Sequence, residues 1–405
     1  MENVSKDKLS DLELEKLLES VDLNEEVKKT KGSFFEKFKF SVLKLNSTRK
    51  EFFEKAPLFS YSLKRILYAF ITLYLSIAIV YILLVLFMPD SALVSDYDFG
   101  KPTSIKPGSV EYYALIENRK IGYGLSGSLI KQVLIYWRNI TPFIPKEVFL
   151  PIRINNLVIE GTYEKTWFFL GVIMNKNNGF VNSNVLDEFK GAIPISFLLG
   201  GVALLLSYVI GIPLGILSAK YKEKTIDNGI KGFFLGISSI PATVLITMIW
   251  IISIKVFGSM GIWGENSYSD FFAIIGVVFL MISIIVVDTR RFVIDEMTSE
   301  YTRFAISKGL SSKYVFYVHI FRNAGIRVIK TLPEAFILCL FGSSILVERF
   351  WNVPGMSKYI LSGVSTNDIY VVLGYIVISS ASGVFTSLLS DLLMALLDPR
   401  IKLTK

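Results

Sequence analysis

The sequence has almost none of the side chains on which disulfides and metal sites depend. Its 405 residues include one cysteine, Cys339, and one histidine, His319. A single cysteine cannot form a disulfide within the chain, and one histidine is too few for the usual histidine-based metal or catalytic sites. We therefore expect Cys339 to pack as a small apolar residue and His319 to make a local hydrogen bond.

Sequence motifs of the common enzyme classes are absent as well. The chain has no phosphate-binding G-x-x-x-x-G-K-[ST] sequence, and it has no C-x-x-C, H-E-x-x-H or G-x-S-x-G pattern. Each of these patterns places a catalytic or metal-binding group at the spacing that its chemistry requires. Their absence predicts a protein that is not an enzyme and that binds no metal and no cofactor of its own.

Charged residues are scarce, at 19% of the chain against about 25% in an average soluble domain, whereas 52% are hydrophobic. A soluble protein of this size could not bury so much apolar surface. Six apolar runs are long enough to cross about 30 Å of hydrocarbon as helices, at about 1.5 Å per residue. They are 66–88, 192–219, 232–254, 271–287, 331–347 and 371–397. We predict an all-α polytopic membrane protein in which the short fourth and fifth runs extend into their charged flanks.

The lysines and arginines between these runs predict the orientation of the helices. Fifteen of them lie in loops 218–231 and 288–330 and in the tail 398–405, whereas loops 255–270 and 348–370 contain three. Because short cytoplasmic loops are enriched in lysine and arginine, we expect both termini in the cytoplasm of a multi-pass plasma-membrane protein. The net charge of +8 then follows from topology, and no nucleic-acid partner is needed to explain it.

Residues 1–65 form a charged extension before the first apolar run. Ser10 and Glu13 fit a helix capping box, and apolar residues spaced among lysines at 35–42 suit a helix that lies in the membrane interface. The alternative is a partly disordered cytoplasmic extension. The first run, 66–88, starts too late and is too long for a cleavable signal, so we interpret it as a transmembrane anchor.

A second long segment, 89–190, separates the first two runs on the outside. It is too long for a simple connection. Residues 157–159 and 162–163 are rich in strand-forming side chains, which predicts a small folded extracellular insert. We expect this insert to serve substrate delivery more than the structure of the helical core, which we place at 191–402.

The loop at 288–330 is the most informative part of the chain. It is amphipathic and basic, and its segments 300–310 and 319–324 are predicted to belong to two helices with a break at Gly309. Glycine permits a turn that other residues resist, and Ala305 is small enough for close approach by another protein. These features indicate a compact knob that docks on a soluble partner, although an ordinary basic loop would carry the same charge.

The sequence of this loop and of several other segments resembles a known family. Residues 300–310, E-Y-T-R-F-A-I-S-K-G-L, resemble the EAA-type coupling loop of ABC importer permeases, in the version of oligopeptide and dipeptide importers. Further similar motifs occur in order along residues 66–402: I-P-L-G-I-L at 212–217, S-S-I-P at 238–241, V-E-R-F-W-N-V-P-G-M at 347–356, N-D-I-Y-V-V at 367–372 and D-L-L-M-A-L-L-D-P-R-I at 391–401. The last motif and the long outside insert resemble the B-type subunit in particular.

The chain departs from the family pattern in and around the loop. Arg303 and Phe304 stand in place of glutamate and alanine, Arg327 in place of a common proline, and Asp288 near a usually basic position. These departures concern the shape of the coupling helices. Residues 1–65 lie outside the resemblance.

The resemblance implies the type I ABC importer permease fold with six transmembrane helices. A second homologous permease would complete the pore, two cytoplasmic ABC ATPases would bind ATP and magnesium, and an extracellular substrate-binding protein would deliver a peptide. Relatives with similar loops carry peptides, nickel complexes or sugars, so the substrate stays open at this point. The residues expected to act in coupling to the ATPases are Glu300, Tyr301, Arg303, Ala305, Lys308, Gly309, Leu310, His319, Arg322 and Asn323.

Four residues are candidates for the translocation pathway: Ser238, Ser239, Pro241 and Glu334. The serines could contact a substrate, but hydroxyls in helices more often bond back to their own helix. Pro241 could shape a cavity or only set a packing angle. Glu334 lies four residues after Lys330, so an ion pair at the membrane interface is the alternative to a substrate contact.

Two other classes of function fit the hydropathy pattern. A secondary transporter or channel acting alone would need polar relays, but the runs contain only Glu334 and Asp391 as ionisable residues, both near an end, and no inverted repeat is evident. A membrane anchor that displays 89–190 would not need the basic knob. The importer permease is therefore the leading interpretation.

Overall fold

The structure is a computed structural model of the chain that describes residues 57–97, 99–100, 104–155 and 157–397. The N-terminal extension up to residue 56, with its predicted interfacial helix, and the tail after residue 397 lie outside the described residues. The described part of the chain is mainly helical, with one hairpin of two strands.

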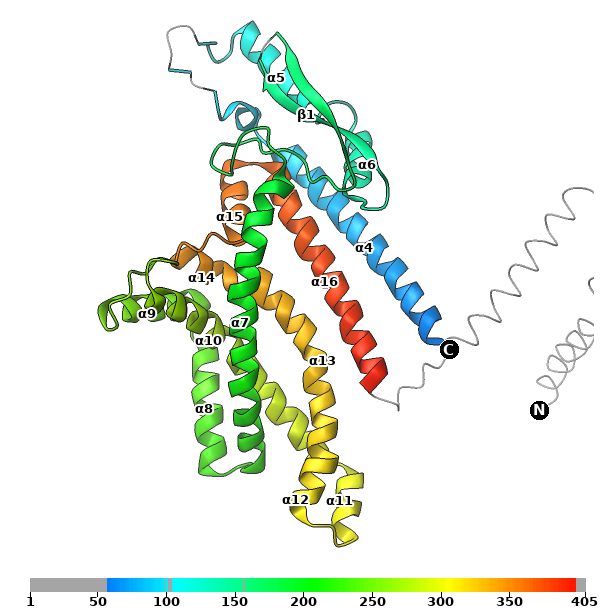
Figure 1. Cartoon of the computed structure of the whole chain (residues 1–405), viewed down its shortest axis with the longest axis vertical. Coiled ribbons are helices and arrows are strands. Elements are labelled where there is room, and N and C mark those ends of the chain that lie inside the picture. Colours follow the sequence, from blue (N-terminus) through cyan, green and yellow to red (C-terminus); the bar gives the residue numbers. More distant parts are fainter. Residues whose placement is uncertain (1–56, 98, 101–103, 156, 398–405) are drawn as a thin grey trace, which may run out of the picture. The chain divides into compact units, whose positions relative to one another are not determined.

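Long apolar helices run in roughly the same direction through the bundle (Figure 1). They are α4 (Pro57–Phe87), α7 (Val185–Lys220), α10 (Ser267–Met297), the helical run Ser312–Phe350 and α16 (Ile369–Leu397). Among the described residues, five helices are long and apolar enough to cross a membrane, or six if a bent pair counts as one span. These helices contain the six predicted apolar runs, and the fourth and fifth extend into their charged flanks as expected.

The third predicted span, 232–254, is broken into two helices. α8 (Thr225–Ser239) and α9 (Ala242–Lys255) meet at an angle of 101°. Proline has no backbone N–H to continue the helix and keeps the residue before it extended, and Ile240 before Pro241 has a φ of −79° and a ψ of 129°. Pro241 therefore interrupts the third run and sets the angle between its two halves, which is one of the two roles considered for it, and the turn of 101° is sharper than a kink within one helix.

Two π-helical segments interrupt the α-helical run of the fifth span. It consists of α12 (Ser312–Tyr314), the π-helical segment η2 (Val315–Phe321), α13 (Arg322–Leu338), a second π-helical segment η3 (Cys339–Ser343) and α14 (Ser344–Phe350). In η3 the side chain of Cys339 is fully buried, and its thiol donates to the carbonyl oxygen of Gly200 on α7 at 3.2 Å. Cys339 therefore packs as a small buried residue, as predicted.

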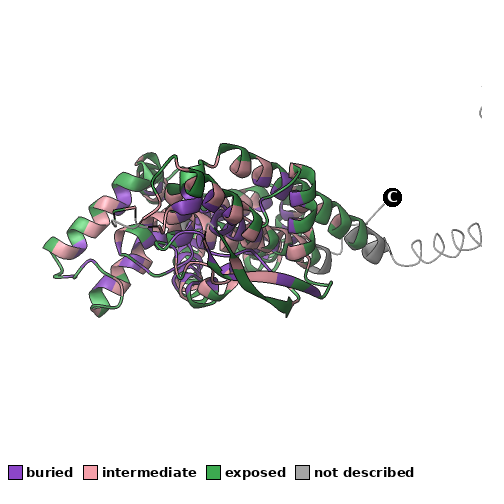
Figure 2. Ribbon diagram, turned by 90° about the horizontal axis from the view of Figure 1, so that it is seen from above, coloured by how far each residue is buried: buried purple, intermediate pink, exposed green. Residues whose placement is uncertain are grey.

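The core of the bundle lies where α7 packs along α10. Small residues on α7 permit close contact, since a Cβ atom on Gly215 would lie 2.6 Å from Cβ of Thr289, and one on Gly211 would lie 2.9 Å from Cγ2 of Ile285. Helices in lipid associate through such packing because lipid tails are as apolar as their own side chains. Seen from above, buried residues gather in the middle of the bundle (Figure 2).

The insert between α4 and α7 is folded. It comprises η1 (Asp90–Val94), α5 (Val110–Gly122), α6 (Leu129–Ile140) and an antiparallel hairpin of β1 (Lys146–Ile154) and β2 (Ile159–Thr166). The predicted strand residues Ile159, Thr162 and Tyr163 lie in β2, whereas Leu157 lies in the turn before it. α7 begins at Val185, so the insert ends before the expected residue 190.

The insert shares one hydrophobic core with the adjoining ends of the long helices. Leu115, Tyr136 and Phe169 of the insert belong to the same buried cluster as Tyr81 on α4 and Tyr370 on α16. Replacing the insert with a short linker would expose these helix ends. The insert therefore also stabilises these helix ends, and the expectation that it serves substrate delivery more than the structure of the helical core stays a prediction.

Asp368, in the short loop between α15 (Ser357–Thr366) and α16, ties the insert to the bundle. Its carboxylate accepts hydrogen bonds from the backbone N–H groups of Met174 and Asn175 and from the side-chain amide of Asn178, each at 3.0 Å. Burial raises the pKa of Asp368, and these donors oppose that shift. The N-D-I-Y-V-V motif is thus a structural joint between the insert and α16.

Replacing Asp368 with alanine is expected to loosen the insert. Each N–H group left buried without an acceptor costs roughly 1–3 kcal/mol. In limited proteolysis of the purified protein, the insert of Asp368→Ala should be cut first and faster than in the wild type. Asp187→Ala is the matched control, because Asp187 pairs with Lys190 on the surface. Equal rates of cleavage for the two variants would show that Asp368 does not hold the insert on the bundle.

Candidate functional site

A helical knob projects from the end of the bundle opposite the insert (Figure 1). We define the knob as residues 300–321, which form α11 (Glu300–Ser307), a turn at Gly309, α12 and η2. Gly309 has a φ of +80°, and a Cβ atom there would meet nothing within 4 Å. The backbone conformation, and not crowding, requires the glycine. The predicted order of helix, glycine turn and second helix is confirmed.

The inner side of the knob packs on the chain's own helices. Ala305 is 7% exposed and lies in a buried cluster with residues of α7, α10, η2 and α13, namely Ala219, Val293, Val315, Ile320 and Ala324. Its methyl group fills space inside the chain. The expectation that Ala305 offers room for a partner protein is therefore wrong.

A polar network, which we call the Glu296 lock, joins the knob to α10 and α13. The hydroxyl of Tyr301 donates to the carboxylate of Glu296, and the amide of Asn323 donates to the hydroxyl of Tyr301 at 2.9 Å. Arg327 pairs with the Glu296 carboxylate at 2.8 Å and with Asp295 at 3.3 Å. Glu296 at the centre of the network is only 6% exposed, whereas the side chains of Arg327 and Asp295 are 41% and 52% exposed, and the network joins the knob to these helices.

Two members of the lock, Tyr301 and Asn323, are among the predicted coupling residues. Glu296 and Arg327 are not among them. Their opposite charges, one before the knob and one after it in the sequence, could have indicated an ion pair. Arg327 stands where a proline is common in the family pattern. Its guanidinium makes the ion pair that a proline could not make, so this departure from the pattern is part of the lock.

The outer side of the knob is apolar, aromatic and basic. Arg303 and Lys308 are exposed, as is Arg322 in the adjoining first turn of α13, and the ammonium of Lys308 lies 4.4 Å from the centre of the Phe304 ring. The apolar side chains, each at least 39% exposed, are those of Phe304, Ile306, Leu310, Tyr314, Tyr317, Val318 and Phe321. We call these apolar residues the knob surface. Exposed apolar patches rimmed by charge are typical of contacts with another protein.

The remaining predicted coupling residues have lesser roles in the geometry. Glu300 is exposed in the first turn of α11, where a negative charge favours the helix. The imidazole of His319 packs edge-on against Tyr314, with ring centres 5.9 Å apart. Within the part of the chain that the structure describes, this imidazole makes no hydrogen bond, so that expectation is not met. The predicted residues all lie in the knob or in the first turn of α13.

A buried ion pair, the Asp227–Arg290 clamp, joins α7, α8 and α10. Asp227 is fully buried and accepts from Nε and Nη2 of Arg290, each at 2.7 Å. The hydroxyl of Ser218 and the backbone N–H of Glu223 also donate to Asp227, at 2.6 and 2.8 Å. The clamp was missed because its two charges lie 63 residues apart in the sequence.

A further buried carboxylate, that of Glu348, lies between helices α7, α14 and α15. Glu348 accepts from the hydroxyl of Ser196 on α7 at 2.7 Å and from both the backbone N–H, at 2.9 Å, and the hydroxyl of Ser357. Gly355 leaves room for this arrangement, since a Cβ atom there would lie 2.4 Å from Oε2 of Glu348. Trp351 of the same motif is fully buried. The V-E-R-F-W-N-V-P-G-M motif is thus a joint between α7, α14 and α15.

The four pathway candidates fall into two groups. Ser238, Ser239 and Pro241 are exposed at the bend between α8 and α9. The hydroxyl of Ser239 donates to the carbonyl oxygen of Leu235 at 2.8 Å, so it bonds back to its own helix, as the alternative interpretation had it. Glu334 instead lies on α13 and lines a cavity with α7 and α10.

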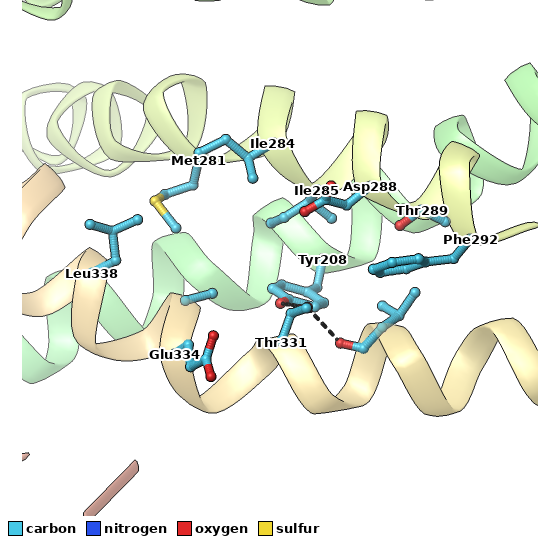
Figure 3. A pocket seen from close by; sticks show the side chains of 12 residues that line it. Tyr208, Met281, Ile284, Ile285, Asp288, Thr289, Phe292, Thr331, Glu334 and Leu338 are labelled. Atoms are coloured by element: carbon cyan, nitrogen blue, oxygen red, sulfur yellow. Dashed lines mark hydrogen bonds between the residues drawn. The ribbon is translucent and has the colours of Figure 1, made fainter. Parts of the chain in front are cut away.

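The cavity beside Glu334 has a volume of about 210 Å³. Its polar lining includes Tyr208, Asp288 and Thr331, and the hydroxyls of Tyr208 and Thr331 lie 3.1 Å apart (Figure 3). No ion pair joins Glu334 to Lys330 in the described chain, so the expected interfacial pair does not form. Two carboxyl groups and the three hydroxyls of Tyr208, Thr289 and Thr331 in an otherwise apolar cavity could hold a polar group of a substrate.

Comparison with known proteins shows the family to which this architecture belongs. Residues 211–403 match the family described as binding-protein-dependent transport system inner membrane component. The dipeptide transport system permease protein DppB of Bacillus subtilis (strain 168) is 31% identical over 231 residues, which cover 55% of this chain and 73% of DppB. The chain belongs to this family. The permease contains the knob, the Glu296 lock and Glu348 within the matched residues.

Two further relatives of the permease are matched over less than two thirds of their own length. The oligopeptide transport system permease protein AmiC of Streptococcus pneumoniae serotype 4 is 30% identical over 223 residues, which cover 54% of this chain and 44% of AmiC. The peptidoglycan transport system permease protein YejB of Agrobacterium fabrum is 31% identical over 250 residues, which cover 55% of this chain and 66% of YejB. The resemblance to oligopeptide and dipeptide permeases is confirmed, and the permease is a multi-pass membrane protein.

Proposed function

We propose that the permease is one membrane subunit of an ATP-driven importer and that it forms half of the translocation pore with a second homologous permease. It would act in transport and not in catalysis, and two separate cytoplasmic ATPases would bind ATP and magnesium and hydrolyse the ATP. The observation that carries this proposal is the knob, which has an exposed apolar and basic surface and is joined to α10 and α13 by the Glu296 lock. A stand-alone transporter would have no use for such a surface.

The distribution of charge supports a cytoplasmic position for the knob. The lysine-rich and arginine-rich loops 218–231 and 288–330 lie at the knob end of the bundle, and the insert lies at the other end (Figure 1). Short loops with this excess remain in the cytoplasm. We therefore propose that both termini are cytoplasmic and that the insert is extracellular, where a substrate-binding protein could deliver its cargo.

The Glu296 lock suggests how ATP-driven motion would reach the pore. Closure of the ATPase dimer would move the docked knob, and the lock would pass this movement to α10 and α13 as rigid bodies. These helices line the cavity that contains Asp288, Glu334 and Thr331. Movement of the knob would thereby change the access to that cavity, which is the coupling that alternating access requires.

Peptides are the proposed substrates. The names of the relatives support this class, since DppB is named for dipeptides and AmiC for oligopeptides. The cavity beside Glu334 contributes a second argument, because its carboxyl groups suit the ammonium end of a peptide. Nickel complexes and sugars are the alternatives that a transport measurement would distinguish.

Transport in reconstituted vesicles tests the proposed function. The permease would be placed in proteoliposomes with its partner permease, the ATPases and the substrate-binding protein, and uptake of a radiolabelled tripeptide would be measured with ATP supplied on the ATPase side. We expect accumulation that requires ATP and every subunit. Uptake by this chain alone without ATP would establish a stand-alone transporter instead.

A further inference from the structure

The insert encloses a second cavity, which the proposed transport function does not use. Its volume is about 600 Å³, within the range of small-molecule binding sites. It lies among α5, α6, the β1–β2 hairpin and the adjoining ends of α4 and α16. Apart from Tyr370, its lining residues come before residue 211, so the cavity lies almost entirely outside the matched family region.

The floor of this cavity is a cluster of tyrosines. The ring centres of Tyr81 and Tyr136 lie 5.3 Å apart, and those of Tyr136 and Tyr370 lie 6.2 Å apart. Two of the hydroxyls have protein partners: that of Tyr81 donates to Oε1 of Gln132 at 3.4 Å, and that of Tyr370 donates to the carbonyl oxygen of Tyr123. The cluster offers ring faces and edges to a ligand.

Among the residues that the structure describes, the hydroxyl of Tyr136 has no hydrogen-bond partner. The residue is 3% exposed and lines the cavity, and its oxygen is buried. Buried polar groups in folded proteins almost always have a partner, because leaving one unsatisfied is costly. The arrangement therefore provides one free donor and acceptor among aromatic rings, which is the chemistry of a binding site and not of a filled core.

Other residues that line the cavity contribute a glycine, two more aromatic rings and two charged side chains. Gly171 has a φ of +109°, and a Cβ atom there would lie 2.4 Å from the ring of Tyr370, so only glycine allows that ring its position. On the hairpin, Phe149 and Tyr163 form a further aromatic pair with ring centres 5.4 Å apart. Arg138 and Glu147 also line the cavity and are exposed. Opposite charges there would suit the polar backbone of a peptide.

We propose that this cavity binds an aromatic side chain with a polar tip, that is, a tyrosine or tryptophan side chain of a peptide segment. The ring would pack against the cluster of Tyr81, Tyr136 and Tyr370, and its hydroxyl or N–H would pair with the hydroxyl of Tyr136. An acyl chain would fill the apolar space but leave that hydroxyl unsatisfied. The segment could belong to a free peptide or to the surface of another protein, and the chemistry is the same for both.

Equilibrium binding to the full-length chain in lipid nanodiscs tests the proposal. The probes are N-acetyl-tyrosinamide, N-acetyl-phenylalaninamide and octanol, titrated by calorimetry. We expect saturable binding of the tyrosine probe, roughly 5–10-fold tighter than that of the phenylalanine probe, as one buried hydrogen bond predicts. Absence of saturable binding, or a preference for octanol, would overturn the proposal.

Variants assign the binding to this cavity. Tyr136→Phe keeps the ring and removes the hydroxyl, so it should abolish the preference for tyrosine over phenylalanine while leaving the phenylalanine probe unaffected. Tyr113→Phe is the matched control, since Tyr113 is exposed on α5 and does not line the cavity. Persistence of the preference in Tyr136→Phe would overturn the assignment. Ile159→Trp, which adds bulk at the wall, should weaken both aromatic probes.

Competition distinguishes the two sources of the side chain. A Gly-Gly-Tyr-Gly-Gly peptide that displaces the tyrosine probe supports a free peptide as ligand, and displacement by the peptide-free substrate-binding protein supports a protein surface. The proposed binding of the side chain goes beyond the transport function and does not depend on it, whereas the assignment of its source uses the substrate-binding protein of the proposed importer. Because these measurements need neither ATP nor the ATPases, a failure here would leave the proposed transport function untouched, and the reverse also holds.

Discussion

Replacing Arg290 with alanine is expected to lower the free energy of unfolding by about 3 kcal/mol. The substitution leaves the carboxylate of Asp227 fully buried without its cationic partner. Loss of one partner of a buried pair costs about 3–5 kcal/mol, and we expect the lower end because the side chain of Arg290 remains 21% exposed. Unfolding of the purified permease in mixed micelles with increasing SDS would measure the change.

Arg291 provides the matched control for this prediction. It is the next residue on α10 and pairs with Asp288 at 3.0 Å, but its side chain is 61% exposed. Such surface pairs contribute about 0–1 kcal/mol, so Arg291→Ala should be nearly silent. An equal loss in the free energy of unfolding for the two variants would show that the Asp227–Arg290 clamp contributes no more than a surface pair. It would also show that the clamp does not hold α7, α8 and α10 together.

Gly309→Val is expected to leave the permease inserted in the membrane but to reduce ATP-driven uptake by at least roughly tenfold. A β-branched residue is strongly disfavoured at the φ of +80° found here, so the turn must change its shape. No side chain would clash, because nothing lies within 4 Å of the added Cβ. The effect should therefore appear in the position of α12 and η2 relative to the ATPases, and not in the folding of the bundle.

Gly309→Asn separates this explanation from a general intolerance of the position. Asparagine adopts positive φ more readily than other side chains, so this variant should retain most of the uptake. Both variants would be compared for membrane insertion, co-purification of the ATPases and peptide uptake. Wild-type uptake by Gly309→Val would show that the loop is only a solvated basic linker. Ala305→Asp is less informative, because Ala305 is buried in the knob's own core.

The membrane helices were predictable because hydrophobicity along the chain is a local property. A run of about 20 apolar residues must cross lipid whatever else the protein does. The bend at Pro241 was less predictable, because a proline in a membrane helix can kink it slightly or end it. Only the extended Ile240 and the 101° angle show that α8 and α9 are separate helices.

The buried joints were beyond prediction because their partners are distant in the sequence. Ser196 and Glu348 are 152 residues apart, and Asn178 and Asp368 are 190 apart. Sequence motifs pointed to Glu348 and Asp368 but not to the side chains that hydrogen-bond to them. Ala305 illustrates the opposite error, since a small residue in a docking loop suggests an outside contact until its own packing is known.

The knob surface could be predicted only in part. Leu310 and the basic residues Arg303 and Lys308 were selected from the motif. Tyr314 in α12 and Tyr317 in η2 were not, because nothing local distinguishes an exposed aromatic residue in these short helical segments from one that faces the core. Their exposure of 50% and 67% adds these two side chains to the candidates for contact with a partner, and Tyr317 is the most exposed residue of the knob surface.

Photo-crosslinking from Tyr317 tests the central claim, that the knob docks on the ATPases. A benzophenone amino acid would replace Tyr317 in cells that express the whole transporter, and a second sample would carry it at Tyr113, which is 61% exposed on the insert. After irradiation we expect an adduct between the permease and an ATPase subunit from position 317 and none from position 113. An ATPase adduct from position 113, or none from position 317, would contradict the account.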